Sequence, residues 1–542
     1  MRLQIISICI VAAWPIARAQ QVDGHRDGLD ASLFVTSDQC IACHSNLHAA
    51  SGEDVSIGYD WRASMMANAA RDPYWHAAVR REVLDHPQAQ AAIEDKCSTC
   101  HMPMARFDAA ARGAQGQVFA NLVQGPGVAM NPLATDGVSC TVCHQIVGDN
   151  FGEPESFDGG FSIESGTLLG ARPVFGPHSV DRGRQAVMQS AGQFVPSEST
   201  HLQQSELCAT CHTLYTHALN DAGEEAGELP EQVPYQEWLH SEYRETRSCQ
   251  SCHMPELAEE TAITSVLGQP RPRFSQHTFR GGNAFMLSML NKYRGELGVT
   301  ALPQELDAAI EDAKRYVGSA AARVAIESAR LLGSVLEVDV AVASLAGHKL
   351  PTAYPSRRAW LHLTVTDAAG TVLFQSGALC SDGAIIGNDN DADAARFEPH
   401  YERIDSADQV QIYESIMVDQ NDRVTTGLLR GVRYVKDNRL LPLGFDKASA
   451  SADIAVHGEA QQDPDFLGGG DRVGYRIDLG SAARATLRVD VELQYQTIGR
   501  RWAENLRAYD AAETQRFVRY YDATAAGSAV RLAATSVTVP NP

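Results

Sequence analysis

The sequence predicts an α+β chain of more than one domain, with a mostly helical and irregular part followed by an antiparallel β-sandwich. The chain has 542 residues, and single domains usually have about 100 to 200. Up to about residue 332, apolar residues recur with helical spacing or lie between Gly- and Pro-rich loops; from residue 333 they alternate with a period of two. Five closely spaced cysteine pairs occur in the first part and none in the second.

The N-terminus has the pattern of a secretory signal peptide. Arg2 precedes an apolar run over residues 3–13, and Ala17 and Ala19 form a small-residue cleavage site. We therefore expect a signal peptide over residues 1–19 and a mature chain in the periplasm or outside the cell. No later stretch approaches the roughly 18 uninterrupted apolar residues that a membrane helix needs, so no integral membrane segment is expected after cleavage.

One pentapeptide, C-x-x-C-H, occurs five times between residues 40 and 253. In this pattern the two thiols add across the vinyl groups of one haem, and the following histidine binds the iron from one side. A zinc site, a thiol redox pair or a disulfide framework does not require a histidine after every second cysteine. The pattern predicts five covalent haem c groups, held by Cys40, Cys43, His44, Cys97, Cys100, His101, Cys140, Cys143, His144, Cys208, Cys211, His212, Cys249, Cys252 and His253.

The haem-binding part is expected to contain short helices joined by long loops. A helical run over 59–71 continues past Asp72 and Pro73, an N-cap followed by proline at the first helical position. Pro103 is expected to end or redirect the helix of the second motif. Residues 113–137 and 147–170 are rich in Gly and polar residues, which predicts loops.

Two further helices are expected to close this part of the chain. An amphipathic helix begins at Asn283, and another begins with Pro303 at its first position. The second is expected to continue through an Ala-rich run toward Leu332. These patterns predict a pentahaem cytochrome c domain over residues 20–297 and a connecting helix over 298–332.

The remaining segment, residues 333–542, is predicted to be an immunoglobulin-like β-sandwich with a helical insertion. Apolar and polar residues alternate over 335–342, and 358–366 and 371–376 flank a turn that ends in Gly370. Several short strands on one segment are typical of such a sandwich. Further strands are expected over 423–436, 472–479, 485–497 and 530–539, and the inserted helix over 502–521.

The second axial ligand of each iron decides between electron transfer and substrate chemistry, because an open position admits a substrate. Histidines close to a motif are the main candidates for this position. His240, His277, His201 and His217 are favoured, and His86 and His348 are further candidates. His348 has two explanations: as a ligand it would fix the sandwich to the haem domain, and as a turn residue it would only order a loop.

Two other features have weaker interpretations. Asp389, Asp391 and Asp393 alternate as in part of a calcium loop, but no Gly or terminal Glu completes the spacing. A solvated acidic turn is therefore favoured over a calcium site. Cys380 belongs to no motif and is expected to be a small buried apolar residue.

The formal charge of −22 at neutral pH argues against nucleic acid and anionic lipid as partners. It suits docking to a positively charged redox partner protein, although an acidic surface also serves solubility. Assembly into a homo-oligomer stays open.

The sequence resembles the multihaem cytochrome c superfamily, in particular cytochromes of the c-552/554 type. The five pentapeptides carry the resemblance, two of them followed by Met-Pro at Met102 and Met254. Trp238 and His240 before Cys249 match the family habit of placing an axial histidine shortly before a motif. The resemblance covers about residues 35–290, and relatives include pentahaem nitrite reductases and octahaem hydroxylamine oxidoreductases.

The resemblance also bears on two single residues. Residues 61–66 are similar to a W-x-x-S-x-H stretch of the family, with Met66 in the place of the histidine. Met66 is therefore a candidate thioether ligand, with helical core packing, or ligation by His76 or His48, as the alternatives. The stretch from Gly347 to Thr352 is similar to the Gly-His-x-x-Pro-Thr opening of a family β-sandwich.

These observations favour an exported electron carrier that passes single electrons along closely spaced haems. The second hypothesis is an oxidoreductase of small nitrogen or sulfur compounds with one five-coordinate haem. The chain lacks the C-x-x-C-K variant that the resemblance associates with catalysis in nitrite reductases, which disfavours this second reading. A third hypothesis is a subunit of an extracellular cytochrome filament.

Overall fold

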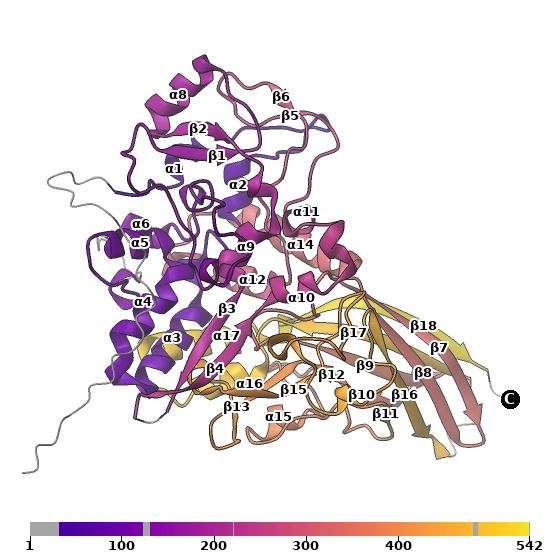
Figure 1. Ribbon diagram of the computed structural model, residues 1–542. Coiled ribbons are helices and arrows are strands. Elements are labelled where there is room, and N and C mark those ends of the chain that lie inside the picture. The colour runs from indigo at the N-terminus through magenta and orange to yellow at the C-terminus, as the bar shows by residue number, and fades with distance from the viewer. Residues whose placement is uncertain (1–31, 123–129, 221, 481–485, 541–542) are drawn as a thin grey trace, which may run out of the picture.

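A computed structural model describes residues 32–122, 130–220, 222–480 and 486–540. The proposed signal peptide lies outside these residues. In Figure 1 the first half of the chain forms a helical and irregular part, at the upper left, and the second half forms packed sheets at the lower right. The chain is thus an α+β protein of more than one part, as the periodicity predicts.

The helical part consists mainly of short helices. In chain order they are α1 (Asp38–Ile41), α2 (Ile57–Arg62), α3 (Pro73–Asp85), α4 (Gln90–His101), α5 (Pro103–Ala111), α6 (Pro132–Thr135), α7 (Cys140–Cys143), α8 (Arg182–Gly192), α9 (Ser205–His212), α10 (Pro234–Leu239), α11 (Cys249–His253), α12 (Ala284–Lys292), α13 (Arg294–Leu297) and α14 (Pro303–Ala320). Each C-x-x-C-H pentapeptide lies on a helix or overlaps its end. One helical turn therefore presents the two thiols and the imidazole of each motif together.

Local sequence signals explain several helix ends. The Asp72 carboxylate accepts hydrogen bonds from the backbone N–H groups of Tyr74 and Trp75, which confirms the predicted N-cap of α3. Pro103 begins α5 directly after α4, so the chain is redirected at Met102 as predicted. The helical run predicted over 59–71 is wrong in its middle, because α2 ends at Arg62 and only a short 3₁₀ turn follows at Ala69–Arg71.

Short strand pairs border this part. They are the parallel pair β1 (Pro173–Gly176) and β2 (Val195–Glu198), and the antiparallel pairs β3 (Leu214–Leu219) with β4 (Glu225–Gln232) and β5 (Thr261–Ala262) with β6 (Pro270–Arg271). Helix α8 connects β1 to β2 and has no buried residue. Neither β1 nor β2 was predicted from the sequence.

The second half of the chain folds into two main packed sheets. Their strands and neighbouring elements are β7 (Ala322–Leu332), β8 (Val335–Ser344), β9 (Arg358–Asp367), β10 (Val372–Ser376), α15 (Asp389–Ala392), β11 (Arg403–Ile404), β12 (Ile412–Tyr413), β13 (Ser415–Val418), β14 (Val424–Thr425), β15 (Arg433–Asp437), β16 (Gly470–Asp478), β17 (Leu487–Gln496) and β18 (Ala529–Val539). One sheet has the order β10-β9-β17-β18, with β12 on β9, and the other β11-β16-β8-β7.

Alternation of apolar side chains builds the core between these sheets. Leu336, Val338 and Val340 of β8 share one buried cluster with Leu363 of β9 and Val491 of β17. The pairs are antiparallel except for β11 with β16, which is parallel. The strand expected over 423–436 is broken into β14 and β15.

The predicted continuation of α14 toward Leu332 is wrong. The helix ends at Ala320, and the Ala-rich run that follows is the strand β7, which pairs with β8 along its length. Ala322 and Val324 enter the sandwich core from this strand. Pairing with β8 and burial outweigh the intrinsic helix preference of the run.

The predicted inserted helix is present as two helices, α16 (Arg500–Leu506) and α17 (Ala512–Asp522). Helix α17 packs on α3 of the helical part, where Arg80 pairs with Glu513 at 2.9 Å and Arg516 lies 2.9 Å from His76 Nδ1. The two halves are therefore joined by an extensive contact, which is visible near α3 in Figure 1.

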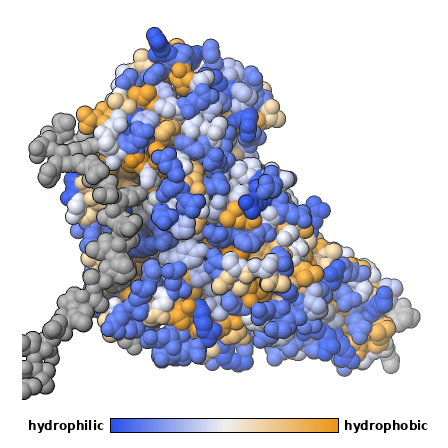
Figure 2. Space-filling model, in the orientation of Figure 1, coloured by the Kyte–Doolittle hydropathy of each residue, from blue (hydrophilic) through white to orange (hydrophobic). Residues whose placement is uncertain are grey.

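The acidic turn near residue 390 is solvated only in part. Asp391 is buried and receives two hydrogen bonds of 2.9 Å from the Arg358 guanidinium. Asp389 lies within ion-pair distance of Arg396. Two of the three carboxylates considered for calcium thus pair with arginines, whereas Asp393 is exposed and accepts the Ala395 backbone N–H at 2.9 Å. No helix in the described residues is long and apolar enough to cross a membrane, and the face in Figure 2 is mostly hydrophilic, with scattered hydrophobic residues.

Candidate haem-binding site

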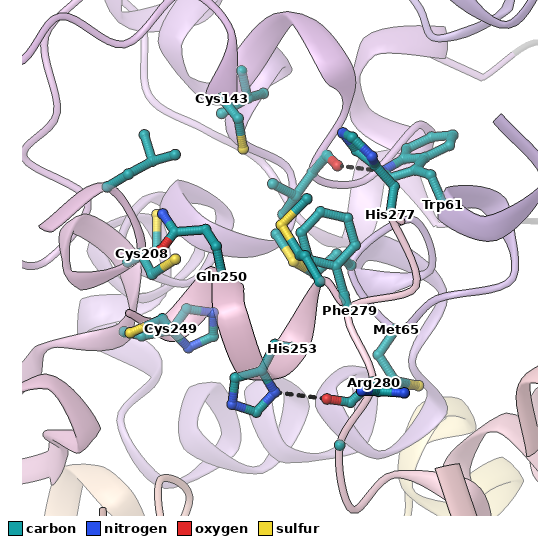
Figure 3. Close-up of a pocket in the computed structure, with 18 of the residues that line it drawn as sticks. Trp61, Met65, Cys143, Cys208, Cys249, Gln250, His253, His277, Phe279 and Arg280 are labelled. Carbon is teal, nitrogen blue, oxygen red and sulfur yellow. Dashed lines mark hydrogen bonds between the residues drawn. The ribbon is translucent and has the colours of Figure 1, made fainter. Parts of the chain in front are cut away.

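A single cavity of about 1450 Å³ runs through the helical part and reaches the sandwich. It is lined by all fifteen cysteines and histidines of the five pentapeptides. Pockets for one small ligand usually measure about 300 to 1,000 Å³, so this cavity suits several groups. In Figure 3, Cys208, Cys249 and His253 lie on one side of the cavity, and His277 lies on the other beside Trp61.

The motif histidines are oriented as metal ligands usually are. His44, His144 and His253 each donate from Nδ1 to a backbone carbonyl, of Ile263, Phe175 and Arg280, at 2.6 Å. His101 donates in the same way to Ala69. Such a bond fixes the tautomer and leaves Nε2 free for a metal.

The cavity also keeps these imidazoles neutral. Burial lowers the pKa of His101 and of His253 to about 4, and it lowers the pKa of His44, His144 and His212 as well. Only a neutral imidazole can bind a metal. The electrostatics of the cavity therefore match the donor set.

Two motif histidines face a second histidine. The ring centroids of His144 and His277 are 6.4 Å apart with planes 14° from parallel, and those of His253 and His348 are 6.3 Å apart at 13°. Metal–imidazole bonds are about 2.0 to 2.1 Å long, so two rings that ligate one metal from opposite sides have centroids about 6.3 Å apart. His277 and His348 also donate from Nδ1 to backbone carbonyls, of Ser275 and Lys349.

The five motifs are neighbours in space. The sulfur atoms of Cys40 and Cys140 lie in hydrogen-bonding contact, which lowers the pKa of Cys40. Equivalent contacts join Cys100 to Cys211 and Cys208 to Cys249. Cys143 of the third motif lies within electrostatic range of both cysteines of the fourth. The fourth motif is thus the junction between the second, third and fifth, and the first is reached through the third.

The other histidines predicted as axial ligands do not line the cavity. His201 is hydrogen-bonded through both ring nitrogens, to Ser199 and to the Ile146 carbonyl. His217 is exposed and lies 2.9 Å from Glu225 on the β3–β4 hairpin, and His240 is exposed at the end of α10. His86 is buried away from the cavity lining, whereas Met66 belongs to the lining.

His178 was not predicted from the sequence. It lies in the cavity lining shortly after β1, and Val180 and Arg184 also line the cavity. No local signal marks it, because a lone histidine in the turn-rich stretch from Arg172 to His178 does not by itself indicate a site. Among the described residues, the histidines outside the motifs that line the cavity are His178, His277 and His348.

Cationic side chains accompany the donor set. Lys96, Arg184, Arg247, Arg280 and Arg357 line the cavity. Haem carries two propionate groups, and guanidinium groups bind carboxylates well. The paired thiols, oriented imidazoles and lining arginines all fit covalently bound haem.

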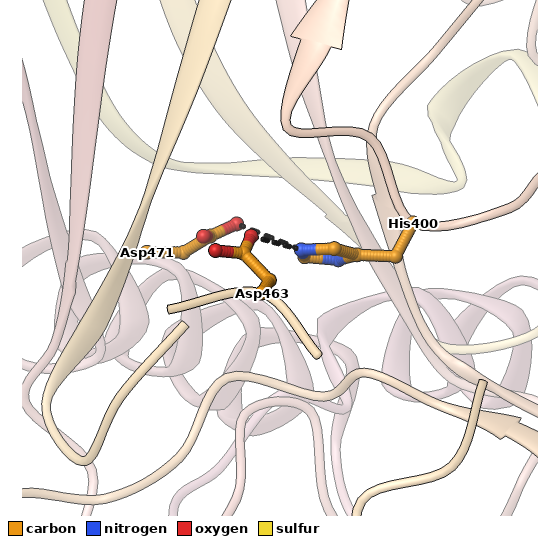
Figure 4. Close-up of side chains that lie close together, drawn as sticks. All are labelled: His400, Asp463 and Asp471. Atoms are coloured by element: carbon orange, nitrogen blue, oxygen red, sulfur yellow. Dashed lines mark hydrogen bonds and ion pairs between the residues drawn. The ribbon is translucent and has the colours of Figure 1, made fainter. Parts of the chain in front are cut away.

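A separate group of possible metal ligands lies in the sandwich. Ligating atoms of His400, Asp463 and Asp471 lie within 4.8 Å of one another, and all three side chains are buried (Figure 4). The His400 Nε2 atom is 2.9 Å from Asp463. Whether this group is a metal site or a hydrogen-bonded cluster depends on which ring nitrogen of His400 carries the proton.

Two amides fix that proton. Gln411 and Asn438 direct their NH₂ groups at His400 Nδ1, at 2.8 and 3.0 Å. Their carbonyl oxygens accept backbone N–H groups of Tyr401 and Glu414, so neither amide is reversed. His400 Nδ1 therefore accepts, and Nε2 donates its proton to Asp463. This arrangement favours a hydrogen-bonded cluster over a metal site.

The cluster predicts a pH-dependent stability. Burial and the nearby Asp463 carboxylate raise the pKa of Asp471 to about 7, and the hydrogen bond that Tyr413 donates to the carboxylate at 2.7 Å acts against this rise. A carboxyl whose folded pKa is raised stabilises the fold at low pH and loses this contribution as the pH rises. As the pH rises from 5 to 8, the free energy of unfolding of the wild type should therefore fall by about 3 kcal/mol more than that of the variant Asp471→Asn. Urea unfolding at both pH values tests this, and parallel pH profiles would contradict it.

Comparisons with known proteins bear on the fold. No protein-family model matches the sequence, and no curated protein matches it significantly. A solved structure, the penta-heme cytochrome c552 from Thermochromatium tepidum, is similar at a TM-score of 0.51 and 16% identity, covering 94% of this chain and 100% of that chain. The chain therefore has the fold of a multihaem cytochrome c over nearly its whole length.

Proposed function

We propose that the protein is an exported pentahaem cytochrome c that transfers electrons between redox partner proteins. The observation that carries this proposal is the single cavity in which all five C-x-x-C-H motifs meet. When bound, each haem supplies one-electron chemistry at its iron. The chain would hold the haems through its thioether-forming cysteines and orient their ligands.

The contacts between motifs support one conducting array. Haems attached at these neighbouring thiols would lie with their edges close together, and the fourth motif would join three neighbours. The N-terminal signal pattern supports export, and the acidic composition suits a basic partner. An immunoglobulin-like identity for the sandwich stays a prediction.

We expect the purified protein to be coloured and to carry the mass of the processed polypeptide plus five haems. Intact-mass measurement and a pyridine haemochrome assay check this number. Because thioether links survive denaturation, the haems should remain with the chain after acid and organic extraction. A colourless protein with the mass of the polypeptide alone would contradict the proposal.

A second candidate function is reduction or oxidation of a small molecule at one open haem. It is favoured by the small number of histidines at the cavity: among the described residues His178, His277 and His348 line it, against five motif histidines. Arg357 lies near His212 and lowers the pKa of this histidine, in addition to the larger effect of burial. Tyr74 and Tyr354, whose hydroxyls are 3.3 Å apart, line the same cavity.

Ferric-state EPR and carbon monoxide binding to the reduced protein separate the two candidates. A pure carrier should show only low-spin haem and bind no carbon monoxide. One high-spin equivalent, with one equivalent of carbon monoxide bound, would favour the second candidate.

A further inference from the structure

The loop between β8 and β9 belongs to the sandwich but reaches the haem cavity. Gly347, His348, Leu350, Pro351 and Thr352 all line the cavity. Gly347 lies against Trp238 and Tyr243 of the helical part, so a larger side chain there would meet both rings. The sandwich thus contributes part of the cavity wall.

His348 occupies a defined position in that wall. Its ring faces His253 of the fifth motif at 6.3 Å and nearly parallel, which is the spacing of two ligands on one metal. His348 Nδ1 donates to the Lys349 carbonyl at 2.8 Å, so Nε2 is the nitrogen left for a metal. Burial lowers the pKa of His348 and so favours the neutral ring.

A buried network of charges holds this loop. The Glu237 carboxylate of α10 is fully buried and accepts from the Lys349 backbone N–H at 3.0 Å and from the Thr352 hydroxyl. These two donors lie on either side of Leu350 and Pro351, directly after His348. A carboxylate from the helical part therefore fixes the backbone that carries the imidazole.

The same network continues into the sandwich. Arg439 lies 3.0 Å from Glu237, and Asp437 pairs with both Arg439 and Lys349 at 2.7 Å. Leu350 and Leu440 exchange two backbone hydrogen bonds, which tie the loop to the segment that follows β15. The loop is thus held from both halves of the molecule.

We propose that the β-sandwich supplies His348 as the sixth ligand of the fifth haem, and that Glu237 is the positioning residue for this ligand. The inference rests on the proposed haem-binding function. It gives the sandwich a direct part in setting the potential of one haem. It also predicts that loosening the sandwich from the helical part opens the iron of the fifth haem.

The test uses the full holoprotein and the variant His348→Ala. We expect five haems to be retained, and the reduced variant to bind one more equivalent of carbon monoxide than the wild type. Ferric EPR should lose one low-spin centre, and added imidazole should restore it. The control is His362→Ala on β9, because this histidine lies outside the cavity lining and its loss is expected to leave both spectra unchanged. If His348→Ala does not accumulate, His348→Met replaces it, with the absorption band of a methionine-ligated ferric haem as the expected result.

Glu237→Gln tests the positioning role. We expect it to bind measurably more carbon monoxide than the wild type, at most one additional equivalent, with all five haems in place. A merely structural role would lower the unfolding midpoint without changing the carbon monoxide stoichiometry, and that result would overturn the role of Glu237. If a His348 variant that holds five haems shows the EPR spectrum and the carbon monoxide stoichiometry of the wild type, the ligand assignment alone is wrong. If the wild type itself holds no haem, the proposed function is wrong.

Discussion

Replacing Asp437 by asparagine is expected to lower the free energy of unfolding by about 3 to 5 kcal/mol, the usual effect of breaking a buried ion pair. Asp437 is buried and pairs with Lys349, itself fully buried, and with Arg439. The variant leaves two buried cations facing a neutral amide. Urea unfolding of the holoprotein near neutral pH, followed by tryptophan fluorescence, measures the change.

The sign of its pH dependence follows from the pKa of Asp437. Burial acts to raise this pKa, but Arg439 and Lys349 outweigh burial and hold it below the usual range. The stabilisation is therefore present above about pH 4 and is lost as the pH falls below that. Asp490→Asn is the matched control, since the exposed Arg488–Asp490 pair should contribute less than about 1 kcal/mol. Equal losses in the two variants would contradict the prediction.

The double variant Cys208→Ala/Cys211→Ala is expected to lose one haem and to interrupt electron passage through the protein. The fourth motif contacts the second and fifth and lies beside the third, so its removal separates the remaining haems into isolated groups. Haem absorbance per protein should fall by about one fifth, in line with one haem per motif. Intact mass and stopped-flow reduction measure the two effects.

Cys40→Ala/Cys43→Ala is the matched control for this prediction. It also removes one haem, but the first motif contacts only the third among the described cysteine contacts. The four remaining haems should therefore still be reduced together, in a single kinetic phase. Identical kinetics in the two double variants would refute a junction at the fourth motif.

Much of the fold follows from local sequence signals. Asp72 and Pro73 predicted the start of α3, and the alternation of Leu336, Val338 and Val340 predicted β8. The strand β7 was not predicted, because an Ala-rich run carries helix preference and only its pairing with β8 decides its conformation. The strand pair β1–β2 was missed for a similar reason: its partners are 22 residues apart, at Pro173 and Val195.

The site divides in the same way. The motif cysteines and histidines could be singled out because each pentapeptide is contiguous in the sequence, and the structure brings all of them to one cavity. Closeness to a motif in the sequence did not predict which candidate histidines line the cavity: His201 and His217 lie outside the lining, whereas His348 lines it from the other half of the chain. His178 was overlooked because a lone histidine in a turn carries no local signal.

The packing of α17 on α3 has a consequence for biogenesis. Arg516 and His76 touch across 440 positions of sequence, so the helix that precedes the second motif gains its final covering only when the last residues of the chain arrive. Contacts of such long range form late in folding. Helix α3 is therefore expected to keep one face uncovered until the last residues of the chain have been made.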